Sequence, residues 1–193
     1  MSDESEGIKA FKAAPGASTT TAVAAAAALL GADLVVVALA WDHPPSEGGI
    51  VTITFLMMIS FVAFINVLHQ MMRFDYIITI LNVKEKENKD VGKEYKEIHQ
   101  ISKGVRVLHV SGLLFTTIAF WIISYKYLVS INGYYIVILL LPFILFFLYW
   151  LPKIIGVEKE VGLLSIESLI QFLIQVLFLV LLCLDFFKII TIP

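Results

Sequence analysis

Five apolar runs dominate the chain, and their length leaves few folds open to it. They cover residues 19–41, 50–70, 107–128, 134–151 and 163–189. A helix needs about 20 mainly apolar residues to cross a bilayer, and a helix satisfies its own backbone hydrogen bonds there. The sequence therefore predicts an all-α integral membrane protein with five transmembrane helices and the lipid bilayer as its main partner.

The composition agrees with lipid as the solvent. Hydrophobic residues make up 59% of the chain and charged residues 16%, whereas about a quarter of a typical soluble domain is charged. The 14 basic and 16 acidic residues nearly balance, and no tract of Lys and Arg is dense enough to follow a phosphate backbone. We therefore expect no nucleic-acid partner. The single cysteine, Cys183, excludes a disulfide within the chain.

The distribution of Lys and Arg between the apolar runs predicts an orientation. If every run crosses the membrane, the segments outside the runs alternate between its two sides. Twelve of the fourteen basic residues then lie on one side, and only Lys126 and Lys188 lie on the other. Basic residues collect on the cytosolic side of membrane proteins. We therefore expect the N-terminus inside and the C-terminus outside, with residues 1–18 as a disordered cytosolic segment and 19–193 as one multi-pass transmembrane domain.

The first apolar run admits one alternative. Its "ALA" at residues 38–40, just before Trp41, resembles a signal-peptidase site, and cleavage would remove residues 1–40. The acidic leader "MSDESEG" and the length of the run instead favour a retained helix.

Residues 71–106, between the second and third runs, carry eight of the basic residues and predict a helical hairpin. Apolar residues of helical spacing continue past the second run, and "ENKDVG" at 87–92 is typical of a turn. On the returning arm, one stripe holds Tyr95, Ile98, Ser102 and Val105 and another holds Lys93 and Lys96. The predicted partner-contact residues are Lys93, Tyr95, Lys96 and Ile98. A solvated connector is the alternative.

Ionisable and amide side chains inside the apolar runs are costly, and so they are candidates for function. Asp33 stands in an Ala- and Val-rich run, two residues after Gly31, which could let a neighbouring backbone approach. Glu167, Gln171 and Gln175 follow one another at spacings of four, which places them on one helix face. These four polar residues form a candidate polar pathway. The alternative is that they hold helices together by hydrogen bonds.

Two further groups of polar residues lie towards the ends of the runs. Lys126 and Asp185 should reach similar depths near the outer surface, which makes them a candidate outer ion pair. Asn66, His69 and Arg73 gather at the inner end of the second run and form a candidate inner-face gate, in which His69 could respond to pH. An interfacial cap at the end of the helix is the alternative for these three.

The sequence carries no recognised catalytic motif. It has no Gly-rich phosphate loop, no nucleophile elbow, no zinc-protease helix motif and no pair of histidines near the middle of the runs. We expect no catalytic residues, no metal, no cofactor and no enzyme activity. The polar groups in the runs favour a homo-oligomeric channel or carrier for protons or small cations, with a non-catalytic accessory or assembly subunit of a larger membrane complex as the alternative.

Overall fold

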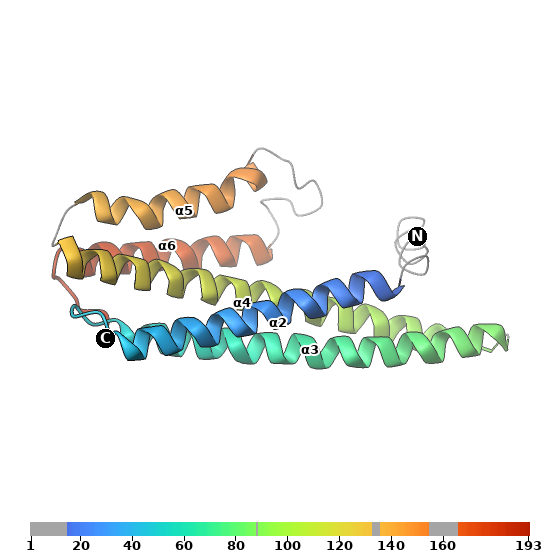
Figure 1. Ribbon diagram of the computed structural model, residues 1–193. Helices are drawn as coiled ribbons and strands as arrows, with labels where there is room; N and C mark the ends of the chain where they lie inside the picture. Colours follow the sequence, from blue (N-terminus) through green and yellow to red (C-terminus); the bar gives the residue numbers. More distant parts are fainter. Residues whose placement is uncertain (1–14, 88, 133–135, 155–165) are drawn as a thin grey trace. The chain divides into compact units, whose positions relative to one another are not determined.

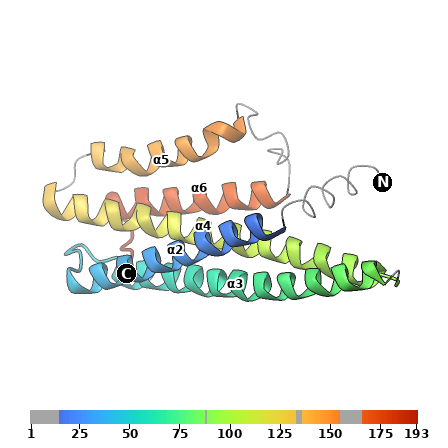
Figure 2. The ribbon, with the colours of Figure 1, turned by 45° about the vertical axis from the view of Figure 1, so that its right-hand side comes forward.

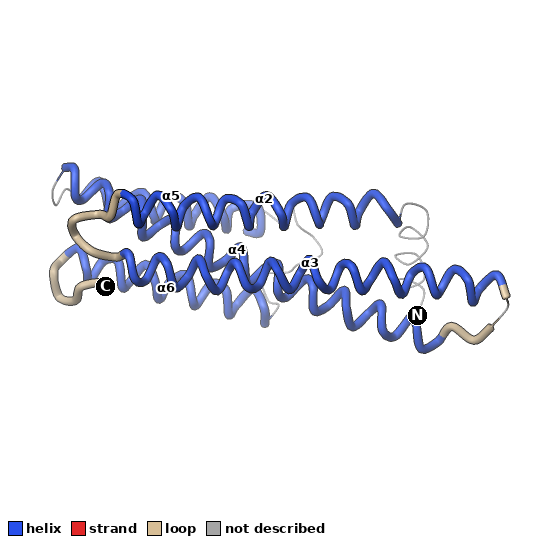
Figure 3. The backbone as a smooth tube through the Cα atoms, turned by 60° about the horizontal axis from the view of Figure 1, so that its bottom comes forward, coloured by secondary structure: helices blue, strands red, loops and turns tan. Residues whose placement is uncertain are grey.

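The computed structural model describes residues 15–87, 89–132, 136–154 and 166–193, and within these ranges the regular structure is entirely helical (Figures 1 and 3). No strand occurs in the described ranges. The helices are α2 (Pro15–Asp42), α3 (Ile50–Lys86), α4 (Gly92–Asn132), α5 (Ile136–Ile154) and α6 (Ile166–Phe186).

Four of these helices are long and apolar enough to cross a membrane. They are the segments Val23–Asp42, Ile50–Lys86, Gly92–Ile131 and Leu169–Phe186, while α5 contributes a shorter apolar stretch, Ile136–Leu148. Large apolar side chains on all five helices are exposed, which suits surfaces that face lipid. The predicted all-α fold with apolar helices of membrane length is confirmed for these four.

The α2–α3 boundary falls where the sequence predicts it. Two prolines, Pro44 and Pro45, cannot continue a helix. Gly48 and Gly49 then adopt positive φ angles of 80° and 95°, which allow the chain to turn into α3. A side chain at Gly49 would also be crowded by Lys126, since its Cβ would lie 3.0 Å from the Lys126 Cγ atom.

The end of α6 differs from the prediction. The apolar run suggests a helix to residue 189, but α6 ends at Phe186 and Lys188 takes a positive φ of 55°. The chain then turns back, so that the backbone N–H of Ile192 donates to Asp185 Oδ1 at 2.8 Å and that of Thr52 donates to the Pro193 carbonyl at 2.9 Å. The helix itself ends in a local turn, in which the Lys188 N–H donates to the Asp185 carbonyl at 3.0 Å and the Ile189 N–H donates to the Leu184 carbonyl at 2.9 Å. The expected start at 163–165 lies outside the described residues.

The chain divides into two compact units. One combines the residues up to Asp33 with Ser60–Gly112, and the other combines Leu34–Ile59 with Leu113–Pro193. The second unit has a core of buried apolar side chains from all five helices, among them Ala40, Ile53, Trp121, Ile122, Tyr125, Trp150 and Leu182. Each unit is described separately below.

In the first unit, α3 and α4 approach closely where a glycine replaces a side chain. Ser60 Oγ donates to the Gly112 carbonyl at 3.0 Å. A Cβ added at Gly112 would lie 2.8 Å from the Phe64 ring. A helix pair in lipid associates by close packing of small residues and by hydrogen bonds of this kind. Gly112 is therefore the small residue that sets this contact. At Gly31, which was expected to serve such a purpose, an added Cβ would meet nothing within 4 Å.

Candidate functional site

The hairpin (residues 71–106) consists of the end of α3 and the beginning of α4, which lie side by side and antiparallel (Figures 1 and 2). The outgoing arm belongs to α3, which ends at Lys86, and the returning arm begins at Gly92. Asp90 accepts a hydrogen bond from the Gly92 N–H at 3.0 Å and so caps the start of α4. Both arms are uninterrupted extensions of candidate membrane-spanning helices.

Three polar contacts connect the two arms, one nearer the spans and two nearer the turn. Arg73 forms an ion pair with Glu97 nearer the spans. Lys84 Nζ lies 2.6 Å from Glu94 Oε1 nearer the turn. Tyr95 donates its hydroxyl hydrogen to Glu85 Oε1 at 2.7 Å. The two contacts near the turn join the end of the outgoing arm to the beginning of the returning arm, as an antiparallel hairpin requires.

A small apolar cluster fills the space between the arms. Phe74, Ile77 and Ile101 are buried, and Ile98 and Val105 pack against them. The predicted stripe was wrong in one member, because Ser102 is exposed and Ile101 is buried. Residues 98, 101 and 105 follow the three-and-four spacing of one helix face, whereas Ser102 lies about 100° further round the helix.

The Glu94 carboxyl lies among groups that favour its charged form. The hydrogen bond from Lys84 is the main cause that lowers the pKa of Glu94 below its ordinary value, and the backbone hydrogen bond and the charges of Lys84 and Lys93 add to it. The carboxylate therefore stays charged at neutral pH and keeps the Lys84 side chain on the inner side of the hairpin.

The predicted partner-contact residues separate into two pairs. Tyr95 and Ile98 are partly buried and make the contacts within the hairpin described above. Lys93 and Lys96 are exposed. Only the two lysines are therefore fully presented to an external partner, and the role in binding stays a prediction for them.

The inner-face gate residues do not converge. Asn66 is exposed and donates from Nδ2 to the Val62 carbonyl of its own helix at 2.8 Å, and His69 is also exposed. Arg73 is engaged with Glu97 on the other arm. Asn66 and Arg73 thus have separate partners, no contact described in the structure joins the three residues, and the gate stays a prediction.

Lys126 on α4 and Asp185 on α6 form a buried ion pair in the second unit. Lys126 Nζ lies 2.8 Å from both carboxylate oxygens of Asp185 and donates a further bond to the Glu47 carbonyl at 2.8 Å. The side chains are only 2% and 7% exposed. Asp185 also accepts the Ile192 N–H. The pair therefore joins two helices, the α2–α3 loop and the C-terminal turn.

On α6, the predicted polar face turns inward. Gln175 is fully buried and accepts a hydrogen bond from the Trp150 indole N–H on α5 at 2.6 Å. Gln171 is 9% exposed one turn earlier. The side-chain Nε2 of Gln175 has no hydrogen-bond partner in the described part of the chain. The Glu167 side chain lies outside the described residues.

Asp33 on α2 is also fully buried, in the first unit. The placement agrees with the expectation that such a carboxyl avoids lipid. Its role in a pathway stays a prediction.

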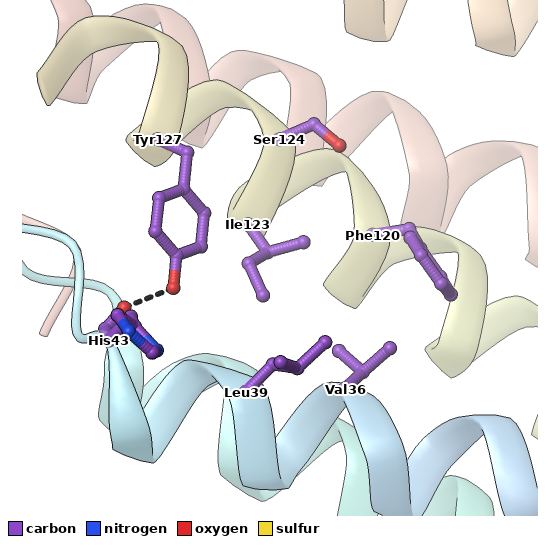
Figure 4. Close-up of a pocket in the computed structure, with 7 residues that line it drawn as sticks. All are labelled: Val36, Leu39, His43, Phe120, Ile123, Ser124 and Tyr127. Carbon is purple, nitrogen blue, oxygen red and sulfur yellow. Dashed lines mark hydrogen bonds between the residues drawn. The ribbon is translucent and has the colours of Figure 1, made fainter. Parts of the chain in front are cut away.

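A small pocket in the second unit lies between the end of α2 and α4 (Figure 4). Its volume is about 370 Å³, and the Tyr127 hydroxyl donates to the His43 carbonyl at one end of it. The lining residues offer no carboxylate and no ammonium group that could bind an ion; they are Val36, Leu39, His43, Phe120, Ile123, Ser124 and Tyr127. Within the described ranges, no group of three His, Cys, Asp or Glu residues could hold a metal ion.

Comparison of the chain with protein-family models, with curated proteins and with solved structures gives no match.

Proposed function

We propose that this chain is a non-catalytic subunit of a larger membrane complex, anchored by its apolar helices and joined to a partner protein through the hairpin. One observation carries the proposal. Helix–helix connections in bundles need only about 2–8 residues, yet residues 71–106 build a braced hairpin with its own apolar cluster and ion pairs. A mere connector does not require such a structure.

The charge distribution supports a cytosolic position for the hairpin. The side that holds it carries twelve of the fourteen basic residues. In this orientation the N-terminus lies inside and the C-terminus outside, and α5 is the fourth of five crossings. The hairpin then stands in water on the side where soluble partners are found.

The contacts of the polar groups inside the spans also support a structural role. The three hydrogens of the Lys126 ammonium have three acceptors within the chain, two on Asp185 and one at Glu47. Gln175 accepts from Trp150 and so joins α5 to α6. Bonds between helices are a common use of polar side chains in membranes.

The test is co-purification from the membranes in which the protein is naturally made. The tagged wild-type chain, solubilised in a mild detergent, should retain a different polypeptide at fixed stoichiometry. A variant in which residues 75–102 are replaced by a short Gly/Ser linker should lose it while keeping its place in the membrane fraction. Recovery of the chain alone, or of the same partner with both forms, would contradict the proposal.

Transport is the second candidate, and the fully buried Asp33 favours it. A homo-oligomer could use this carboxyl to pass protons or small cations. Purified protein in liposomes should then carry a proton or K⁺ flux that Asp33→Asn abolishes without changing assembly. The subunit proposal expects no flux from wild type or variant, so this assay separates the two functions.

A further inference from the structure

The hairpin sorts its charges between an inner and an outer side. On the returning arm, Glu94 and Glu97 point to the outgoing arm, where Lys84 and Arg73 neutralise them. No acidic residue follows Glu97 before Glu158. The outward face of this arm is therefore basic although the hairpin as a whole carries both signs.

Four exposed basic side chains form this outward basic face, which we define as Lys93, Lys96, Lys103 and Arg106. At about 100° per residue, Lys96 and Lys103 lie almost opposite the buried Ile101, with the other two on either side of them. None of the four takes part in the ion pairs found within the described residues. Their charges are thus available to a partner.

The spacing of these charges suits the carboxylates of another helix. Lys96 and Lys103 are seven residues apart, which is about 10.5 Å along the helix axis. Charged residues that repeat every seven positions are those that pair across two packed helices. An acidic helix with carboxylates at this spacing could meet both lysines at once.

The continuity of α4 favours a polypeptide, and not anionic lipid headgroups, as the partner of the basic face. This helix runs without a break from Gly92 to Asn132, and its predicted membrane segment begins at residue 107. Lys96 therefore stands about 16 Å beyond that boundary along the helix axis and Lys93 about 21 Å. The attraction of a charged membrane surface falls off within about 8 Å at physiological salt, so lipids would engage only the lower end of the face.

We propose that the outward basic face binds an acidic, Asp- and Glu-rich helical segment of the partner protein. This inference rests on the proposed subunit function and names the chemistry of the contact. Like charges across such a contact are strongly unfavourable, and long-range attraction speeds association. Reversal of one central lysine should therefore weaken the complex markedly.

The test places a photo-crosslinking amino acid at Gln100, which is exposed between the two central lysines, in the full chain in its native membranes. We expect a crosslink that mass spectrometry maps to an acidic segment of another polypeptide. Lys96→Glu should reduce its yield about tenfold or more. Lys86→Glu is the matched control, since it makes the same charge change at an exposed lysine on the other arm, and it should leave the yield within about twofold.

Three outcomes would overturn the inference: a crosslink to lipid only, a crosslink to a segment without Asp or Glu, or equal yields with Lys96→Glu and Lys86→Glu. A partner that still co-purifies with Lys96→Glu in normal amount would refute the basic face as the contact and leave the subunit function standing. Absence of any partner from the wild-type chain would refute the subunit function itself.

Discussion

At the scale of single residues, Gly112 allows α3 and α4 to pack closely against each other. Its Cβ, if present, would lie 2.8 Å from the Phe64 ring, whose rigid edge has little room to yield. Gly112→Ala should lower the free energy of unfolding by about 1–3 kcal/mol through overpacking. Equilibrium unfolding of the purified protein, followed by loss of helical circular dichroism, measures the change.

Gly104→Ala is the matched control for this variant. Gly104 lies in the same helix, but a Cβ there would meet nothing within 4 Å. Alanine should therefore raise stability by about 0.5–1 kcal/mol, because glycine is the poorer helix former. If the two variants had equal effects, the close contact at Gly112 would not exist.

The buried ion pair gives a second residue-scale prediction. Lys126→Met leaves the Asp185 carboxylate buried with only the Ile192 N–H as a described partner, and should reduce the free energy of unfolding by about 3–5 kcal/mol. The double variant Lys126→Met/Asp185→Asn removes both charges and keeps an oxygen for Ile192, so it should recover most of the loss. A double variant as unstable as the single one would contradict the pairing.

Residue-scale contacts were only partly predictable from the sequence. The similar depths of Lys126 and Asp185 follow from counting residues along two helices, and the structure brings their charged atoms together. The Ser60–Gly112 contact depends on how two helices are rotated against each other, which no local pattern encodes. The available signal for this contact was the position of Gly112 itself, because a glycine inside an apolar helix can mark a close contact with a neighbouring helix.

At the scale of elements, the hairpin should lose stability in acid. The pKa of Glu94 is lowered in the folded hairpin, chiefly by the hydrogen bond from Lys84. The stabilising contribution of this pair is therefore complete above the ordinary glutamate pKa of about 4.5 and is lost as the pH falls through the lower folded value. Amide hydrogen exchange on the returning arm, corrected for intrinsic rates, should accelerate over this range.

Lys84→Met provides the control for the pH effect. Without the ammonium group the Glu94 pKa should return towards its ordinary value, so the variant hairpin should exchange faster at neutral pH and respond less to acid. Identical acid profiles for wild type and Lys84→Met would show that another group is responsible.

The elements themselves were largely predictable, because length, periodicity and breakers are local properties. Two prolines and two glycines place the α2–α3 boundary, and a polar turn places the tip of the hairpin. The end of α6 was missed because the helix closes with a local turn in which Lys188 adopts a positive φ, and the apolar residues after Phe186 do not signal that turn. Ile101 was missed because Ser102 was assigned to the packed stripe. The buried residue between Ile98 and Val105 is instead Ile101.

At the scale of the whole molecule, the apolar runs predicted helices of membrane-spanning length and left the assembly of the protein open. Apolar runs of the right length require helices in lipid, and four described helices meet that requirement. Partner choice depends on surfaces, and the surface that we propose for it is the outward basic face of the hairpin. That face became visible only once Glu94 and Glu97 were placed on the inner side.

The subunit function is tested by the composition of the particle that a mild detergent releases from native membranes, measured by native mass spectrometry. We expect this chain together with a different polypeptide at fixed stoichiometry, and we expect that polypeptide to be absent when the hairpin is replaced by a Gly/Ser linker. A particle built only of copies of this chain, accompanied by a cation flux in liposomes that Asp33→Asn abolishes, would contradict the subunit function.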